Sequence, residues 1–246
     1  IATPFVSYPN NVQNFVQSGL TTTNGISVAN NTDLVNYRVS YSNMSNRGIV
    51  PNSDLFRNTL NLNSMLKLNK RLSVSTNVDV SRNNSNNRPA GERGTNPLEW
   101  VYAISPNINI IVLPDYWEPG QEGLQQRTPY NGSWNNPYFL AYEVNNGFVR
   151  DRLYGNVRAD WQISDDLSFM VRYGMDTYTE QRETKVANSY TSDPRGAYGL
   201  VDIKHFESNA DFLLSYKKQL TSFDFSASIG GNMRRNNGST IRNATK

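Results

Sequence analysis

The chain has 246 residues, a net charge of +3 and no cysteine, which excludes disulfides and thiolate metal sites. Only 37% of the residues are hydrophobic, a low share for a compact soluble core, yet 14 Tyr, 10 Phe and 4 Trp argue against disorder. The longest basic cluster, Arg234-Arg235, is too short for a nucleic-acid-binding arm, so we expect no nucleic-acid partner. No stretch approaches the roughly 20 apolar residues of a spanning helix, and residues 1–4 lack the basic and apolar regions of a signal peptide.

The first third of the chain predicts four strands, which begin near Leu20, Val35, Phe56 and Leu72. The fourth has the clearest alternation, with Leu72, Val74, Thr76, Val78 and Val80 on one face. Its other face carries Ser73, Ser75, Asn77, Asp79 and Ser81. A period of two is typical of a strand with one apolar and one polar side.

Residues 85–147 form a segment too long for a plain connection, and such segments are usually functional or disordered. Asn96 followed by Pro97 predicts a short helix over 96–102, with Asn96 as its N-cap. Seven aromatic residues of the segment are the candidate contacts to a substrate or to a lid protein: Trp100, Tyr116, Trp117, Tyr130, Trp134, Tyr138 and Phe139. The equally weighted alternative is that these rings pack on one another and give the segment its own small core.

Four further strands are predicted to begin near Val149, Leu167, Phe206 and Phe223, which makes eight in all. We expect Val74, Val78, Val157, Trp161, Leu167, Phe169 and Val171 to face lipid. We expect Asp79, Arg158, Asp160 and Arg172 to face inward, with Arg150 and Arg152, toward water or an interior domain. A barrel strand crosses a bilayer in about 10 residues, of which only every second must be apolar.

Short and long connections alternate along the chain. The short turns are at residues 30–33, 69–71, 164–166 and 219–221, and the longer loops are near 45–55, 85–147 and 184–204. Outer-membrane barrels have short periplasmic turns and long extracellular loops, so the long loops and both chain ends are expected on the extracellular side. Trp161, Tyr216 and Phe223 lie close to short turns, as expected for an aromatic girdle at the inner interface.

Several stretches together closely resemble the SusC/RagA family of TonB-linked outer-membrane transporters of the Bacteroidetes. They are Asn36-Tyr37-Arg38-Val39-Ser40-Tyr41-Ser42-Asn43, Gly48-Ile49-Val50-Pro51-Asn52-Ser53-Asp54, Arg57-Asn58-Thr59-Leu60-Asn61-Leu62-Asn63, Asn135-Asn136-Pro137-Tyr138-Phe139, Asp151-Arg152-Leu153-Tyr154-Gly155-Asn156-Val157 and Asn209-Ala210-Asp211-Phe212-Leu213-Leu214-Ser215. Each block is weak alone, but their succession covers nearly the whole chain.

The resemblance implies a 22-stranded barrel closed by an N-terminal plug and driven by TonB, with a SusD-type surface lipoprotein as lid and oligosaccharides or peptides as cargo. We therefore expect an all-β chain whose residues 1–246 are an antiparallel transmembrane segment of about eight strands from that barrel domain. The signal peptide, plug and remaining strands are expected to lie outside it. The segment alone is expected to transport nothing.

No catalytic or cofactor site is expected. His205, at a predicted strand start, is the single histidine, and without cysteine it supports neither a zinc site nor a catalytic triad. Asp115 and Glu118 flank Tyr116-Trp117 but lack a calcium-loop pattern. The alternative function is a soluble all-β binding or adhesion module, which would not need detergent for extraction.

Overall fold

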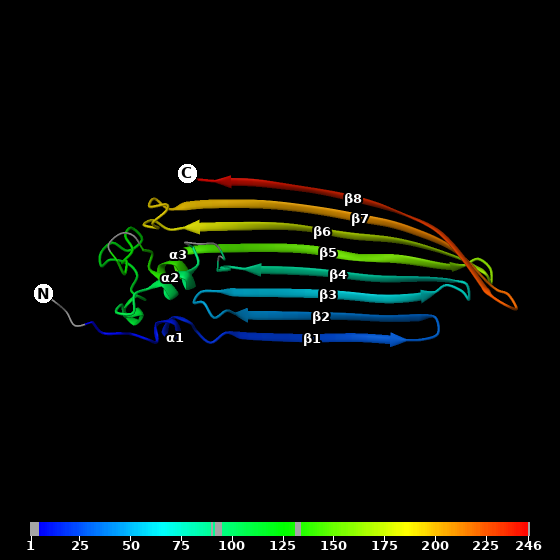
Figure 1. The fold of residues 1–246 in the computed structure, drawn as a ribbon, viewed down its shortest axis with the longest axis horizontal. Helices are drawn as coiled ribbons and strands as arrows, with labels where there is room; N and C mark the ends of the chain where they lie inside the picture. The colour runs from blue at the N-terminus through cyan, green and yellow to red at the C-terminus, as the bar shows by residue number, and fades with distance from the viewer. Residues whose placement is uncertain (1–4, 90, 92–94, 131–133, 246) are drawn as a thin grey trace.

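The computed structural model describes residues 5–89, 91, 95–130 and 134–245, so residues 1–4, tested above for a signal peptide, lie outside the described part. Over the described residues the chain forms one antiparallel sheet of eight strands in sequence order, which confirms the predicted all-β class (Figure 1). The strands are β1 (Leu20–Asn31), β2 (Val35–Arg47), β3 (Asp54–Lys67), β4 (Leu72–Ser85), β5 (Val144–Gln162), β6 (Leu167–Val186), β7 (Ala197–Gln219) and β8 (Asp224–Ala244). The helices are α1 (Asn11–Phe15), α2 (Pro97–Ala103), the 3-10 turn η1 (Ile110–Val112) and α3 (Pro137–Glu143).

The two ends of the sheet differ as the alternation of short and long connections predicts. The four short turns lie together at one end, and the β2–β3, β4–β5 and β6–β7 connections lie at the other with both chain ends (Figure 1). The short turns are built from polar side chains: the Thr32 hydroxyl donates to the Val35 carbonyl at 3.0 Å. The placement of the 85–147 segment beside the other two long loops is therefore confirmed.

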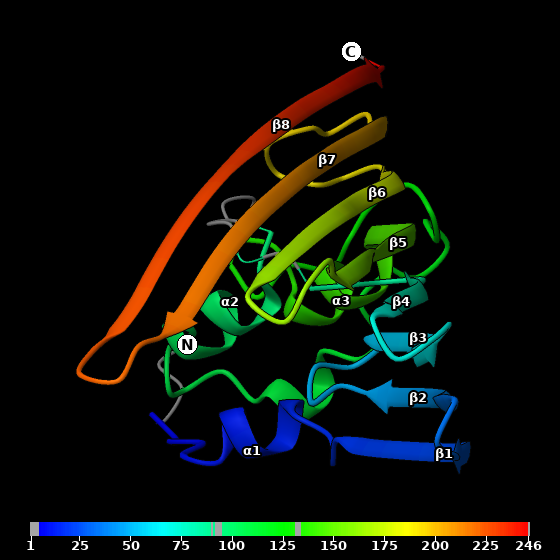
Figure 2. The same cartoon turned by 90° about the vertical axis from the view of Figure 1, so that its right-hand side faces the viewer.

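The sheet is curved and open. In the part of the chain that the structure describes, β1 pairs only with β2 and β8 only with β7, so no ladder joins the first strand to the last. Figure 2 shows the resulting arc, with the helices inside the curve. The expectation of an antiparallel segment of about eight strands is confirmed, and these strands do not close on themselves.

The strands are longer than the alternation indicated, and the loops are correspondingly shorter. The β2–β3 connection is residues 48–53 rather than 45–55, the β4–β5 connection ends at Glu143 rather than 147, and the β6–β7 connection is 187–196 rather than 184–204. At this end of the sheet both faces carry polar side chains, so pairing continues where the apolar signal has stopped. His205 consequently lies inside β7, not at a strand start, and stacks on Tyr178 with 5.0 Å between the ring centroids.

No helix among the described residues is long and apolar enough to cross a membrane.

Candidate functional site: the concave wall and its loop body

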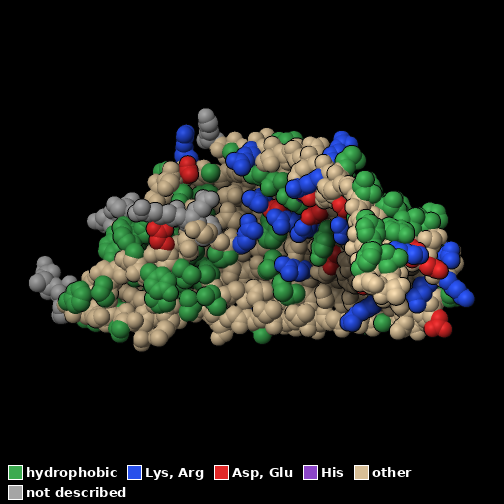
Figure 3. Space-filling model, turned by 45° about the vertical axis from the view of Figure 1, so that its right-hand side comes forward, with side chains coloured by type: hydrophobic (Ala, Val, Ile, Leu, Met, Phe, Trp, Pro, Cys, Tyr) green, Lys and Arg blue, Asp and Glu red, His purple; other side chains and the backbone are tan. Residues whose placement is uncertain are grey.

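Strand register places the polar side chains on the concave face of the sheet. Residues paired directly across two strands project to the same side, so the pairs Arg158–Arg172 and Arg172–Asp211 place these three residues together. Asp79, which pairs with Tyr154, and Asp160 fall on the same face by the same register. Figure 3 shows Lys, Arg, Asp and Glu side chains gathered in the hollow of the molecule.

The opposite, convex face carries the apolar positions. The seven residues expected to face lipid all lie on it: Val74, Val78, Val157, Trp161, Leu167, Phe169 and Val171. Several of them stay open to the surroundings, such as Val157 and Trp161, which are 50% and 49% exposed. The predicted division of the strands into two faces is therefore confirmed residue by residue.

Most charges of the concave wall are held in pairs across the strands. Arg152 binds Asp176 with two bonds, from Nε to Oδ1 at 2.8 Å and from the guanidinium to Oδ2 at 2.5 Å. Arg172 contacts Asp211 at 2.8 Å. Arg158 donates to Asp160, two residues along the same strand. Bidentate guanidinium–carboxylate pairs fix side-chain geometry, so these groups give the wall a defined shape with little net charge.

A row of asparagines crosses the wall at one level. Asn63, Asn77, Asn156 and Asn209 occupy successive register positions, with Gly174 between the last two. Two hollows of about 660 and 430 Å³ lie along this row and share Asn77 and Asn156 in their linings. The asparagine row therefore presents amide donors and acceptors, without net charge, to whatever occupies the concave side.

The β4–β5 segment folds into a small helical body at the end of the sheet that carries the long connections. α2 begins as predicted, with Asn96 Oδ1 accepting from the Leu98 amide at 3.0 Å. α3 begins in the same way, with Asn136 Oδ1 accepting from the Tyr138 amide at 2.8 Å. Sequence reasoning missed α3, although Asn136-Pro137 is the same start signal as Asn96-Pro97.

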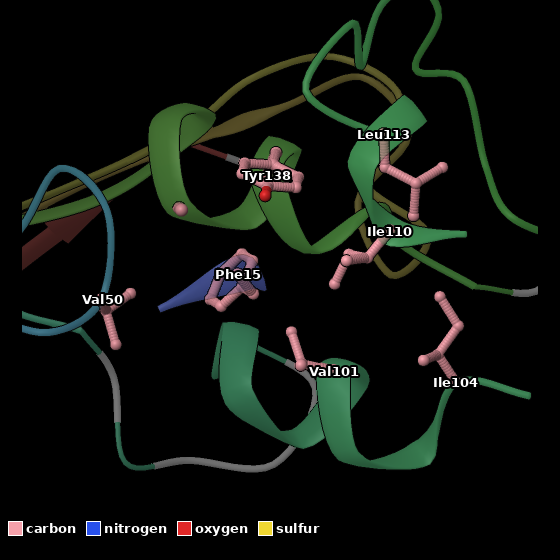
Figure 4. Close-up of a cluster of buried hydrophobic side chains, with 8 residues drawn as sticks. Phe15, Val50, Val101, Ile104, Ile110, Leu113 and Tyr138 are labelled. Atoms are coloured by element: carbon pink, nitrogen blue, oxygen red, sulfur yellow. The ribbon is translucent and has the colours of Figure 1, made fainter. Parts of the chain in front are cut away.

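The core of this body also includes residues from distant parts of the chain. Phe15 of α1 and Val50 of the β2–β3 connection pack with Val101, Ile110 and Tyr138 (Figure 4). Phe15 meets Tyr138 edge-on with 5.0 Å between centroids. A second cluster is formed by Phe139, Leu140, Val144 and Tyr190. The body is thereby fixed to the N-terminal segment and to the β2–β3 and β6–β7 connections.

The structure brings the seven candidate aromatic residues into this body. Trp134 lies between Trp100 and Tyr130, at centroid distances of 4.7 and 5.1 Å. Trp117 contacts Phe139 at 5.4 Å and Tyr116 at 5.6 Å. Tyr138 and Phe139 are buried, at 9% and 0% exposure, whereas the other five rings are partly exposed. The rings do pack together, and contact between the exposed ones and a ligand stays a prediction.

Tyr116 links the middle of the β4–β5 segment to its C-terminal end. Its hydroxyl donates to Glu143 Oε1 at 2.9 Å. Burial, followed by this hydrogen bond to a carboxylate, raises the pKa of the Tyr116 phenol above its ordinary value. The neutral phenol is therefore the form that the folded segment holds. Among the described residues, no three His, Asp or Glu side chains come together as a metal site would need.

Comparison with known proteins gives a fold but no sequence family. No family model matches the chain, and no curated protein matches it. Among solved structures, the RagAB peptide importer in a "closed-closed" state superposes with a TM-score of 0.76 at 17% identity, over 96% of this chain and 26% of that one. Its "open-open" state gives 0.75 over the same shares of the two chains. BauA, the ferric preacinetobactin receptor of Acinetobacter baumannii, gives 0.54 at 12% identity, over 92% of this chain and 31% of that one.

The chain thus spans about a quarter of the length of the RagAB chains that it matches. Its open, eight-stranded antiparallel sheet has the fold of a segment of a larger transmembrane β-barrel.

Proposed function

We propose that residues 1–246 form part of the barrel wall of a TonB-dependent outer-membrane transporter of the SusC/RagA type. The observation that carries the proposal is the sorting of the sheet into an apolar convex face and a polar concave face, with the long connections all at one end. The wall of an outer-membrane barrel requires this arrangement, because it has lipid outside and a polar lumen inside, with extracellular loops at one end and periplasmic turns at the other.

The likeness to the RagAB importer and to BauA supports transport as the activity. The cargo we propose is an oligosaccharide or a peptide, taken up together with a SusD-type lipoprotein lid and driven by TonB through a plug outside these residues. A soluble binding module is disfavoured, because large apolar side chains such as Val157, Trp161 and Phe212 remain 47–50% exposed over one continuous face.

The first test is uptake by cells that carry the complete protein. Transport driven by TonB depends on the energised inner membrane, so a protonophore should abolish uptake while surface binding persists. Uptake that continues unchanged after the protonophore would contradict the proposal.

The second test concerns the aromatic residues of the helical body. Trp117→Ala and Trp134→Ala should lower uptake several-fold at unchanged surface expression, because stacking on a ring contributes about 1–2 kcal/mol. Tyr102→Ala is the matched control, since this ring is 71% exposed in the same body and lies outside both core clusters. Tyr138→Ala removes a buried ring and should loosen the body itself. Unchanged uptake in both tryptophan variants would assign those rings to packing alone.

A further inference from the structure

One group of charges on the concave wall is unbalanced. Arg150 and Arg182 both bind the carboxylate of Glu180, whose side chain is fully buried. Arg150 Nε donates to Glu180 Oε2 at 2.6 Å and Arg182 Nε donates to Oε1 at 2.5 Å. Each oxygen of this carboxylate is thus occupied by a different guanidinium.

A third guanidinium lies beside them. Arg88 is placed over the ring of Phe148 at 4.7 Å from its centroid, and Phe148 pairs directly with Arg182 across the strands. Among the described residues Arg88 has no carboxylate partner. Three cations against one anion leave a formal charge of +2 for this cluster, which we call the arginine cluster (Arg88, Arg150, Arg182).

The arginine cluster is rigid and open at the same time. Glu180 fixes two of its members, Arg150 and Arg182. Two of the guanidinium groups also pack over ring faces, Arg88 over Phe148 and Arg150 over Tyr178 at 5.1 Å from its centroid. The side chains of Arg150 and Arg182 are nevertheless 35% and 45% exposed. Guanidinium groups fixed in this way keep free N–H donors for a planar anion, at little further cost in side-chain entropy.

The other arginines on the wall provide a contrast. Arg152, Arg158 and Arg172 each have a carboxylate of their own. Arg38 and Arg57, on the same face of β2 and β3, contact Ser27 and Asn83 rather than a carboxylate. The arginine cluster differs from them because two of its guanidinium groups are fixed on one buried carboxylate. It lies at the end of β5 and β6 nearest the long connections, where a solute entering from that side would meet it first.

We propose that the arginine cluster binds the carboxylate of a solute entering the lumen. The proposal rests on the proposed function only for the direction of entry. A carboxylate can come from a uronic acid in an oligosaccharide or from an acidic peptide, and the cluster chemistry is the same for both.

The test is calorimetric binding to the complete protein in detergent, which does not require transport. The probes are trigalacturonate against its neutral methyl ester, and triglutamate against triglutamine. At least one acidic probe should bind about tenfold or more tightly than its neutral counterpart, and added salt should weaken that binding. Binding of one acidic probe alone supports the site and identifies the source of the carboxylate. Equal binding of the acidic and neutral members in both pairs would overturn it.

The variant is Arg88→Gln, because Arg88 can be truncated without leaving a buried carboxylate unpaired. Arg172→Gln is the matched control on the same wall. Arg88→Gln should weaken the acidic probe about tenfold, and Arg172→Gln by less than about twofold. Equal weakening by Arg88→Gln and Arg172→Gln would show a general field rather than a site. If the probes bind as expected but the protein transports nothing, the arginine cluster stands and the proposed function fails.

Discussion

Neighbouring residues of a single strand meet opposite surroundings. Val157 lies on the convex face, four residues or about 13 Å along β5 from Trp161 at the short-turn end, and Asn156 faces the hollow. We expect Val157→Arg to cost about 2–4 kcal/mol, because it puts a charge near the middle of the bilayer. Asn156→Arg should cost less than about 1 kcal/mol. Urea unfolding in phospholipid vesicles measures both, and equal costs would contradict the assignment of the faces.

The phenol of Tyr116 gives the helical body a dependence on alkaline pH. Its pKa is raised in the folded chain from the ordinary value of 10.0 by burial and by Glu143. The unfolded segment loses this proton first as the pH rises, so the contribution is fully present below pH 10 and is lost above it. Trp117 lies 5.6 Å from Tyr116 and reports the change by fluorescence. A Tyr116→Phe variant should lose this step, which begins near pH 10, whereas the exposed Tyr102→Phe should keep it.

The strands show what alternation can and cannot predict. Near the short turns one face of the sheet is apolar, so Leu167, Phe169 and Val171 indicate β6 in the sequence. Toward Val186 the same strand carries Glu180, Arg182 and Lys185, and no two-residue pattern remains. Backbone pairing continues there because it needs no particular side chain. The faces of the strands and their ends at the short turns could therefore be predicted. Their ends at the long connections could not, since β5 and β7 begin at Val144 and Ala197 rather than near Val149 and Phe206.

The helical body was predicted only in part, for a different physical reason. The start of α2 depends on a local contact of Asn96, which the sequence shows directly. The packing of Phe15 against Tyr138 joins residues that are more than a hundred positions apart. The arginine cluster likewise depends on register, since Arg150 and Glu180 meet only when β5 and β6 are paired.

Because the strands pair without a break, inserting an odd number of residues into one of them turns the side chains that follow to the other face. β6 pairs one-for-one with β5 and β7 over its whole length, without a bulge. One Ala inserted after Gly174 turns every later β6 side chain to the other face, so we expect loss of the folded form. The same insertion in the 187–196 connection should be tolerated. Heat-modifiable mobility in gels, together with surface labelling, distinguishes the two, and a folded Gly174 insertion would contradict the register.

The unpaired edges of the sheet, β1 and β8, can be tested by disulfide crosslinking. The chain contains no cysteine, so introduced pairs report cleanly. Val28→Cys with Val39→Cys, directly paired between β1 and β2, should crosslink efficiently on oxidation. Ile26→Cys with Met233→Cys, on β1 and β8, should not crosslink within one molecule, because these two edge strands are not paired with each other. Efficient crosslinking of the second pair would mean that the eight strands close on themselves.

The gapless pairing of all seven ladders also bears on how such chains diverge over evolution. The fold requires an apolar or a polar side chain at each position of the sheet, depending on the face, and seldom a particular residue. One apolar residue can therefore replace another on the convex face, and one polar residue another on the concave face. Insertions, in contrast, are confined to the connections. Parity and spacing can then be kept while residue identity is not, and the RagAB chain superposes over 96% of this chain at 17% identity.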